Sequence, residues 1–240
     1  MDWLHVREPV SAWTHGAWGL FCLPATLLLS LRAGRDLLKQ IGFAVFGLSL
    51  ALCFAGSWLY HSVPPSSVPL CMRLDYIGIY LLIAGTYTPV VLVVLDAWRR
   101  WSMLALIWLM GGIGIVLRAC AVPLPDEIST GLYILMGWVS LLCYIELARR
   151  LSHRALCLLW IGGLIYSGSA VLNVLHWPTL WPGVFGSHEL YHLFVMAASL
   201  CHFVFMARVV TPYEREALSS VPHPGRRGIR ASGLPELQQA

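Results

Sequence analysis

Apolar residues along this chain are grouped into seven long runs, and most polar residues lie between them. An α-helix rises 1.5 Å per residue, so about 20 apolar residues cross the hydrocarbon core of a bilayer, which is about 30 Å thick. Each run is close to this length. The pattern therefore predicts seven transmembrane helices, which we place at residues 12–31, 41–62, 74–95, 101–118, 130–148, 155–174 and 187–209.

The composition supports a membrane protein. Hydrophobic residues make up 58% of the chain, charged residues make up 12%, and the mean hydropathy is +0.70. Soluble domains contain about 25% charged residues, and the short connections leave no room for one. We expect an all-α fold, an integral membrane seven-transmembrane-helix bundle over residues 12–209. Residues 1–11 would be a polar lead-in, and residues 210–240 would be a disordered tail rich in proline, glycine and arginine.

The sixteen lysine and arginine residues predict the orientation of the bundle. Thirteen of them lie in the tail and in the loops after the first, third and fifth runs, whereas Arg7, Arg73 and Arg118 lie on the opposite side. Because basic residues accumulate on the cytoplasmic side, we expect a multi-pass protein of the cell membrane with its carboxyl terminus in the cytoplasm. The basic residues form no single patch, so we expect no nucleic-acid partner.

Ionisable side chains gather at one end of the predicted bundle. In a seven-helix bundle, the starts of the first, third and seventh helices and the end of the second helix share one membrane face. That face holds His15, Ser57, His61, Arg73, Asp75, His188, Glu189 and His192. Ionisable groups within a membrane are costly unless they pair with each other or bind a metal.

The spacing of three histidines indicates a zinc site. His188 and His192 are four residues apart, about 40° around a helix and 6 Å along its axis, so they can bind one ion. His61 ends the second run and can supply a third imidazole. Three neutral imidazoles and a water molecule form a catalytic zinc arrangement. Asp75 would then be the base for that water, and Ser57, one turn before His61, would hydrogen-bond to it.

Each of these signals has a simpler interpretation when it is taken alone. The two histidines of the last helix could be polar residues of a helix start, and His61 could be an interfacial histidine. Asp75 could form an ion pair with Arg73. We expect His15 to support the site or the helix packing rather than to bind metal. His202, about 15 Å further along the last helix than the histidine pair, is too deep for the same ion and is expected to hydrogen-bond within the bundle.

Several motifs carry a resemblance to a known family. They are Glu8-Pro9 with Thr14-His15-Gly16, Ser57-x-x-x-His61, the run from Leu74 to Pro89, Gly163-Leu164-Ile165-Tyr166, and His188-Glu189-x-x-His192 with His202. Over residues 8–209 the chain resembles the hemolysin III family and, more distantly, the progestin and adipoQ receptors, a group that includes the alkaline ceramidases. The resemblance implies seven helices, zinc held by His61, His188 and His192 beside Ser57 and Asp75, and an activity on lipid amides. Adiponectin receptors carry this site on the cytoplasmic side, whereas the charge bias here places it outside.

Three functions are compatible with these residues. The leading hypothesis is a zinc-dependent hydrolase that acts on an amide or ester of a membrane lipid. The second is a non-enzymatic receptor, or a protein of membrane homeostasis or cytolysis, in which zinc is structural. The third is an intramembrane zinc protease, because residues 188–192 match H-E-x-x-H with Glu189 as the base. The sequence shows neither the mid-span charges nor the paired repeats that are typical of a transporter. The oligomeric state is left open.

Overall fold

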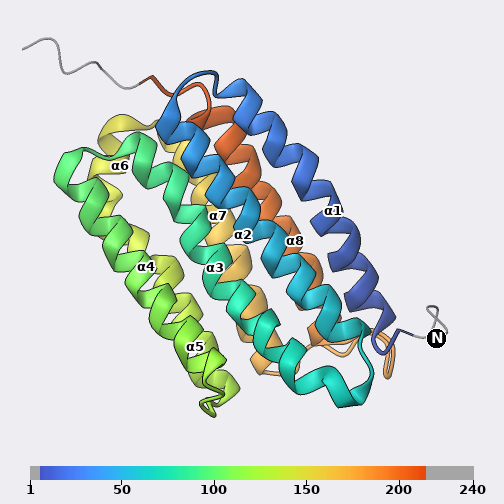
Figure 1. Cartoon of the computed structure of the whole chain (residues 1–240). Coiled ribbons are helices and arrows are strands. Elements are labelled where there is room, and N and C mark those ends of the chain that lie inside the picture. Colours follow the sequence, from blue (N-terminus) through green and yellow to red (C-terminus); the bar gives the residue numbers. More distant parts are fainter. Residues whose placement is uncertain (1–5, 215–240) are drawn as a thin grey trace, which may run out of the picture.

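The computed structural model describes residues 6–214, and Figure 1 shows that its membrane-spanning segments are all helical. Seven segments in this range are long and apolar enough to cross a membrane, which confirms the predicted all-α bundle. The helices are α1 (Pro9–Arg32), α2 (Leu37–Ser62), α3 (Val68–Val94), α4 (Ala97–Ala119), α5 (Asp126–Trp138), α6 (Tyr144–Arg150), α7 (His153–Val174) and α8 (Ser187–Phe205). A short π-helix, Met206–Val210, continues α8. From residue 215 onward, the predicted tail lies outside the described residues.

The fifth span is interrupted near its middle. A 3-10 turn, Val139–Cys143, separates α5 from α6, and together they form the span Asp126–Arg150. Backbone groups at such a break lose their helical partners and need others within a membrane. The hydroxyl of Tyr87 on α3 supplies them: it donates to the carbonyl of Gly137 and accepts the N–H of Ser140 at 2.8 Å. The break is therefore supported from a neighbouring helix.

Several helices begin before the apolar runs that predict them. α1 starts at Pro9, α3 at Val68 and α5 at Asp126. The first turn of a helix tolerates proline, because its N–H groups have no intrahelical partner, and it favours acidic residues. Pro69 lies in the first turn of α3, and Glu127 lies in that of α5. Hydrophobicity alone does not detect such polar or proline-containing first turns.

The spans form a ring around a common interior. α2 packs between α1 and α3, and α8 packs along α7 and also contacts α1. α5 contacts both α3 and α7, which completes the ring, whereas α4 packs on α3 outside it. Six of the seven spans therefore surround one interior space.

Polar contacts join the helices at the end opposite the three histidines. Nζ of Lys39, near the start of α2, donates to the carbonyl of Thr211 at 2.7 Å. Glu146, at the end of the fifth span, is buried, and its carboxylate lies 2.7 Å from Arg99 and 3.3 Å from Arg150. These ion pairs explain how an apolar run can include an acidic residue.

The interface between α2 and α3 requires glycine. A Cβ atom on Gly78 of α3 would lie 2.7 Å from the Cα of Cys53 on α2, and one on Gly42 would lie 2.7 Å from the Cα of Pro89. A backbone atom cannot rotate away as the end of a side chain can. These glycines let the two helices approach more closely than any other residue would allow.

We expect Gly78→Ala to lower the unfolding temperature of the detergent-solubilised protein. The added methyl group forces α2 and α3 apart, and such overpacking costs roughly 1–3 kcal/mol. Gly112→Ala on α4 is the matched control, because nothing lies within 4 Å of its added Cβ and alanine is the better helix former. Thermal unfolding followed by circular dichroism compares the two. If Gly78→Ala is as stable as Gly112→Ala, the close packing is wrong.

Candidate metal centre

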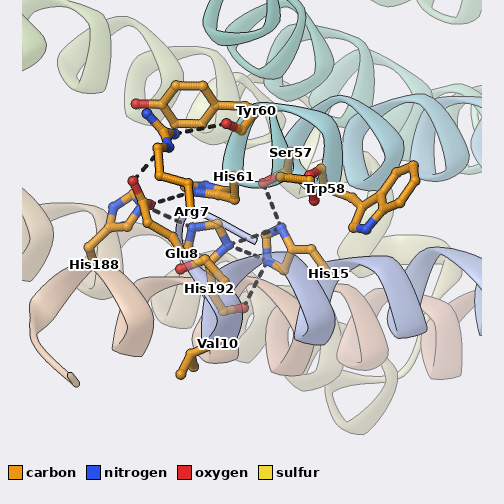
Figure 2. Close-up of polar contacts among 12 residues, drawn as sticks. Arg7, Glu8, Val10, His15, Ser57, Trp58, Tyr60, His61, His188 and His192 are labelled. Carbon is orange, nitrogen blue, oxygen red and sulfur yellow. Dashed lines mark hydrogen bonds and ion pairs between the residues drawn. The ribbon is translucent and has the colours of Figure 1, made fainter. Parts of the chain in front are cut away.

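The three candidate ligands lie together at one end of the ring. His61 is in the last turn of α2, and His188 and His192 are in the first two turns of α8. Figure 2 shows the three rings grouped together, and one nitrogen from each lies within 4.8 Å of the others. The Nε2 atoms of His188 and His192 are 3.1 Å apart. Two nitrogens at about 2.0–2.1 Å from a tetrahedral zinc are separated by about 3.3–3.4 Å, so small movements would let all three share one ion.

One nitrogen of this group has no hydrogen-bond partner among residues 6–214. His61 is completely buried, at 0% exposure, and its Nε2 makes no hydrogen bond. Buried polar atoms in native proteins are nearly always paired, because an unpaired one costs free energy. A metal ion would satisfy this nitrogen, and imidazole is a common zinc ligand. The residues present therefore fit zinc.

The segment before α1 is bound to the end of α2 that carries His61. Nδ1 of His61 lies 2.5 Å from Oε2 of Glu8, and the backbone N–H of Glu8 donates to the carbonyl of His61 at 3.1 Å. Arg7 donates from Nη2 to the carbonyl of Tyr60 at 2.8 Å and lies 3.3 Å from Oε1 of Glu8 (Figure 2). One ligand is thus held by a carboxylate from the beginning of the chain.

A fourth histidine, His15 of α1, contacts a second ligand. It is buried, and its Nε2 lies 2.9 Å from Nδ1 of His192. Its Nδ1 lies 2.8 Å from the hydroxyl of Ser57. Among the described residues, His15 is not part of the group that could share an ion. This position agrees with a supporting role rather than with metal binding.

Ser57 and Asp75 lie beside the histidines. Ser57 is buried one turn before His61, and its side chain also interacts with that of Asp75 on α3. Asp75 lines the same cavity as His188. Of the ion pairs among residues 6–214, none joins Asp75 to Arg73. The simple ion pair considered from the sequence is therefore absent.

Two other candidates from the sequence make contacts within the helices. The carboxylate of Glu189 accepts the backbone N–H of Gly186 at 2.8 Å, so it caps the start of α8, where it also complements the helix dipole. Nε2 of His202 lies 3.2 Å from the carbonyl of Leu159 on α7. His202 hydrogen-bonds within the bundle, as expected.

A cavity of about 540 Å³ adjoins the histidines and extends into the ring of helices. Six spans contribute to its wall: α1, α2, α3, the fifth span, α7 and α8. Away from the histidines, the wall includes aliphatic side chains such as Leu82, Ile83 and Ile134. Small-molecule sites have volumes of about 300–1,000 Å³, so the space is sufficient for a ligand or part of one.

Glu8 is the site residue to which the sequence analysis gave no role of its own. It belongs to a motif that carries the family resemblance, but nothing in its immediate neighbourhood identifies its partner. The available signal is that Glu8 precedes His15 by seven residues in the sequence. Residues seven apart return to one helix face after two turns. This signal points to a shared face, but not to His61.

The chain is similar to known proteins over most of its length. Residues 3–203 match the family described as Haemolysin-III related. The chain is 34% identical over 209 residues to Hemolysin-3 of Bacillus cereus, covering 86% of this chain and 93% of that protein. It is 30% identical over 200 residues to the Hemolysin-3 homolog of Bacillus subtilis, covering 82% and 91%. It is 26% identical over 230 residues to the Adiponectin receptor protein of Drosophila melanogaster, covering 82% of this chain and 49% of that protein.

Proposed function

The chain belongs to the haemolysin-III-related family, and from this premise we propose that it is a zinc-dependent membrane hydrolase that cleaves an amide or ester bond of a membrane lipid. The observation that supports this most is the convergence of three imidazoles beside a large interior cavity that Asp75 also lines. A structural metal site needs no adjoining space, whereas a catalytic site needs room for its substrate.

In this proposal, His61, His188 and His192 hold the zinc ion. Zinc with three protein ligands supplies Lewis acidity and activates a water molecule. Asp75 accepts the proton of the attacking water and later returns it to the leaving group, as a general base and then a general acid. Ser57, which interacts with Asp75, holds its carboxylate in place.

The surroundings of the site favour a lipid as the substrate. The cavity is enclosed by membrane-spanning helices, and its wall includes Leu82, Ile83 and Val195. An acyl chain can occupy the apolar part while the bond to be cleaved remains beside the histidines. The resemblance to the group that includes the ceramidases supports the same substrate class.

We propose that the protein lies in the cell membrane with the histidines near the outer face. Of the basic residues in the described chain, nine lie at the end opposite the histidines, and only Arg7, Arg73 and Arg118 lie at the histidine end. This bias supports a carboxyl terminus in the cytoplasm. A reporter enzyme that is active only in the cytoplasm, fused after Ala240, should be active. An inactive reporter on an intact, membrane-inserted fusion would contradict this orientation.

A second function is favoured by two observations. His61 is completely buried, as in a structural metal site, and one similar protein is named an adiponectin receptor. A receptor with structural zinc would depend on the metal for folding. Removing the metal would then lower the unfolding temperature, whereas removing a catalytic ion would affect mainly activity.

Lipid hydrolysis by the purified protein tests the proposal. Zinc-loaded protein in detergent is incubated with a panel of ceramides and fatty-acid esters, and released fatty acid is measured by mass spectrometry. We expect at least one lipid to be cleaved, with the activity lost on chelation and restored by zinc. Bound zinc without any hydrolysis, together with a lower unfolding temperature after chelation, would support the receptor instead.

The protease hypothesis is tested in the same preparation. Glu189→Gln should retain lipid hydrolysis, because the Glu189 carboxylate caps α8 and lies outside the proposed chemistry. Peptide cleavage that is lost in Glu189→Gln but kept in Asp75→Asn would indicate a protease of the H-E-x-x-H type.

A further inference from the structure

Helix α1 supplies none of the three candidate ligands, yet it contacts two of them. We propose that α1 positions the ligands of the metal centre, with Glu8 orienting His61 and His15 orienting His192. This inference rests on the metal site of the proposed function. Glu8 is the N-cap residue of α1, and His15 follows it by seven residues, so both side chains project from one face, two turns apart.

The contact with Glu8 determines which nitrogen of His61 can bind a metal. An ionised carboxylate only accepts hydrogen bonds, so its 2.5 Å contact requires the proton of His61 to be on Nδ1. A neutral imidazole has one such proton, and Nε2 is therefore left with a free lone pair. Nε2 of His61 is also buried and has no hydrogen-bond partner in the part of the chain that the structure describes. Carboxylates in this position fix both the tautomer and the ring orientation of metal-binding histidines.

His15 acts in the same way on His192. Because Nε2 of His192 faces Nε2 of His188, metal binding through it leaves the proton of His192 on Nδ1. This N–H can donate to Nε2 of His15, which lies 2.9 Å away. His15 then carries its own proton on Nδ1 and donates it to the hydroxyl of Ser57 at 2.8 Å. The Ser57 hydroxyl can in turn donate to Asp75.

Two competing contacts do not change this assignment. The carbonyl of His192 lies 3.3 Å from Nε2 of His15, and a bond between them would require the His15 proton on Nε2. That carbonyl lies inside α8, where it accepts the helical bond from the residue four positions later, so it needs no second donor. Nδ1 of His192 also lies 3.0 Å from Nδ1 of His15, but that atom faces the Ser57 hydroxyl at 2.8 Å. The shorter contact of His192, at 2.9 Å to Nε2 of His15, therefore favours the His15 proton on Nδ1. Hydrogen bonds then run in one direction from His192 through His15 to Ser57, whose side chain interacts with that of Asp75.

Glu8 is itself held rigidly. Its backbone N–H donates to the carbonyl of His61, and Arg7 lies between its Oε1 and the carbonyl of Tyr60. The guanidinium group of Arg7 also lies 4.7 Å from the centre of the Tyr60 ring. Because these contacts reach the same turn of α2 that carries His61, the carboxylate and the imidazole are held as one unit (Figure 2).

Metal binding to the full-length purified protein tests the inference, with zinc and cobalt as the probes. Glu8→Leu keeps the side-chain size but removes the acceptor, so we expect zinc affinity to fall roughly 10–100-fold, as when other such partners are removed. The visible absorption of bound cobalt should also change, because the His61 ring is no longer fixed. Glu8→Gln keeps an oxygen for Nδ1 of His61 and should bind with intermediate affinity. His15→Leu should weaken binding over the same range.

Glu127→Leu is the matched control. Glu127 is an exposed carboxylate at the start of α5, on the same membrane face, and within residues 6–214 it forms no hydrogen bond to a histidine. A Glu8→Leu variant with wild-type zinc affinity and cobalt spectrum would overturn the inference, as would an equal loss in Glu127→Leu. If Glu8→Leu does not fold, Glu8→Gln decides: intermediate affinity supports the inference, and wild-type affinity overturns it. Failure of the wild-type protein to bind either metal would refute the proposed function before any variant is compared.

Discussion

Replacing His188 by alanine is expected to remove stoichiometric zinc from the purified protein. The ligand nitrogens of His188, His61 and His192 lie within 4.8 Å of one another, so each is needed to complete the set of three. We expect zinc affinity to fall more than about a hundredfold, beyond the 10–100-fold effect of losing a supporting contact. Zinc per chain, measured by plasma mass spectrometry, and competition with a coloured chelator give the two values.

The control for this variant is His153→Ala. His153 is an exposed histidine in the first turn of α7, at the opposite end of the bundle, and its loss should leave the zinc content unchanged. If His188→Ala retains one zinc per chain with wild-type affinity, then His188 is not a ligand. The proposed hydrolase would then lack its metal site.

Asp75→Asn is expected to remove most lipid hydrolysis while zinc remains bound. Asparagine has nearly the same size as aspartate, but its amide cannot accept a proton as a base. A positioned general base contributes about 10²–10⁴-fold to the rate, so we expect kcat/KM to fall within that range. Asp75 is not in the group of residues that could share the ion, so zinc affinity should change little. Steady-state kinetics and zinc analysis of one preparation separate the two effects.

Asp126→Asn is the matched control for this prediction. Asp126 lines the same cavity, but its carboxylate lies 3.3 Å from the hydroxyl of Tyr76. We expect a much smaller loss of hydrolysis than in Asp75→Asn. Equal losses in the two variants would show that cavity charge, rather than a base at Asp75, matters for the reaction.

Much of the fold could be predicted because a bilayer requires apolar helices of a fixed length. The predicted second span, 41–62, and the observed helix Leu37–Ser62 end at the same residue. The reason is local: Pro64 disfavours a helical conformation at Val63, the residue before it. Helix starts were predicted less well, because polar first turns such as Asp126-Glu127 carry no hydrophobic signal.

The break in the fifth span could not be predicted from the sequence around it. The hydroxyl that supports its free backbone groups belongs to Tyr87, which is 53 residues before Ser140. A local reading of the apolar run predicts a continuous helix. The partner that makes the break tolerable becomes known only when α3 and α5 are placed side by side.

The sequence by itself determined the seven spans and the shared face of His188 and His192, because both follow from the fixed rise and rotation of an α-helix. Only the tertiary structure decided that Glu8 lies against His61 and that His15 lies between Ser57 and His192. These contacts join residues that are 53, 42 and 177 positions apart. No local rule relates residues so distant, and the packing of α1 against α2 and α8 brings them together.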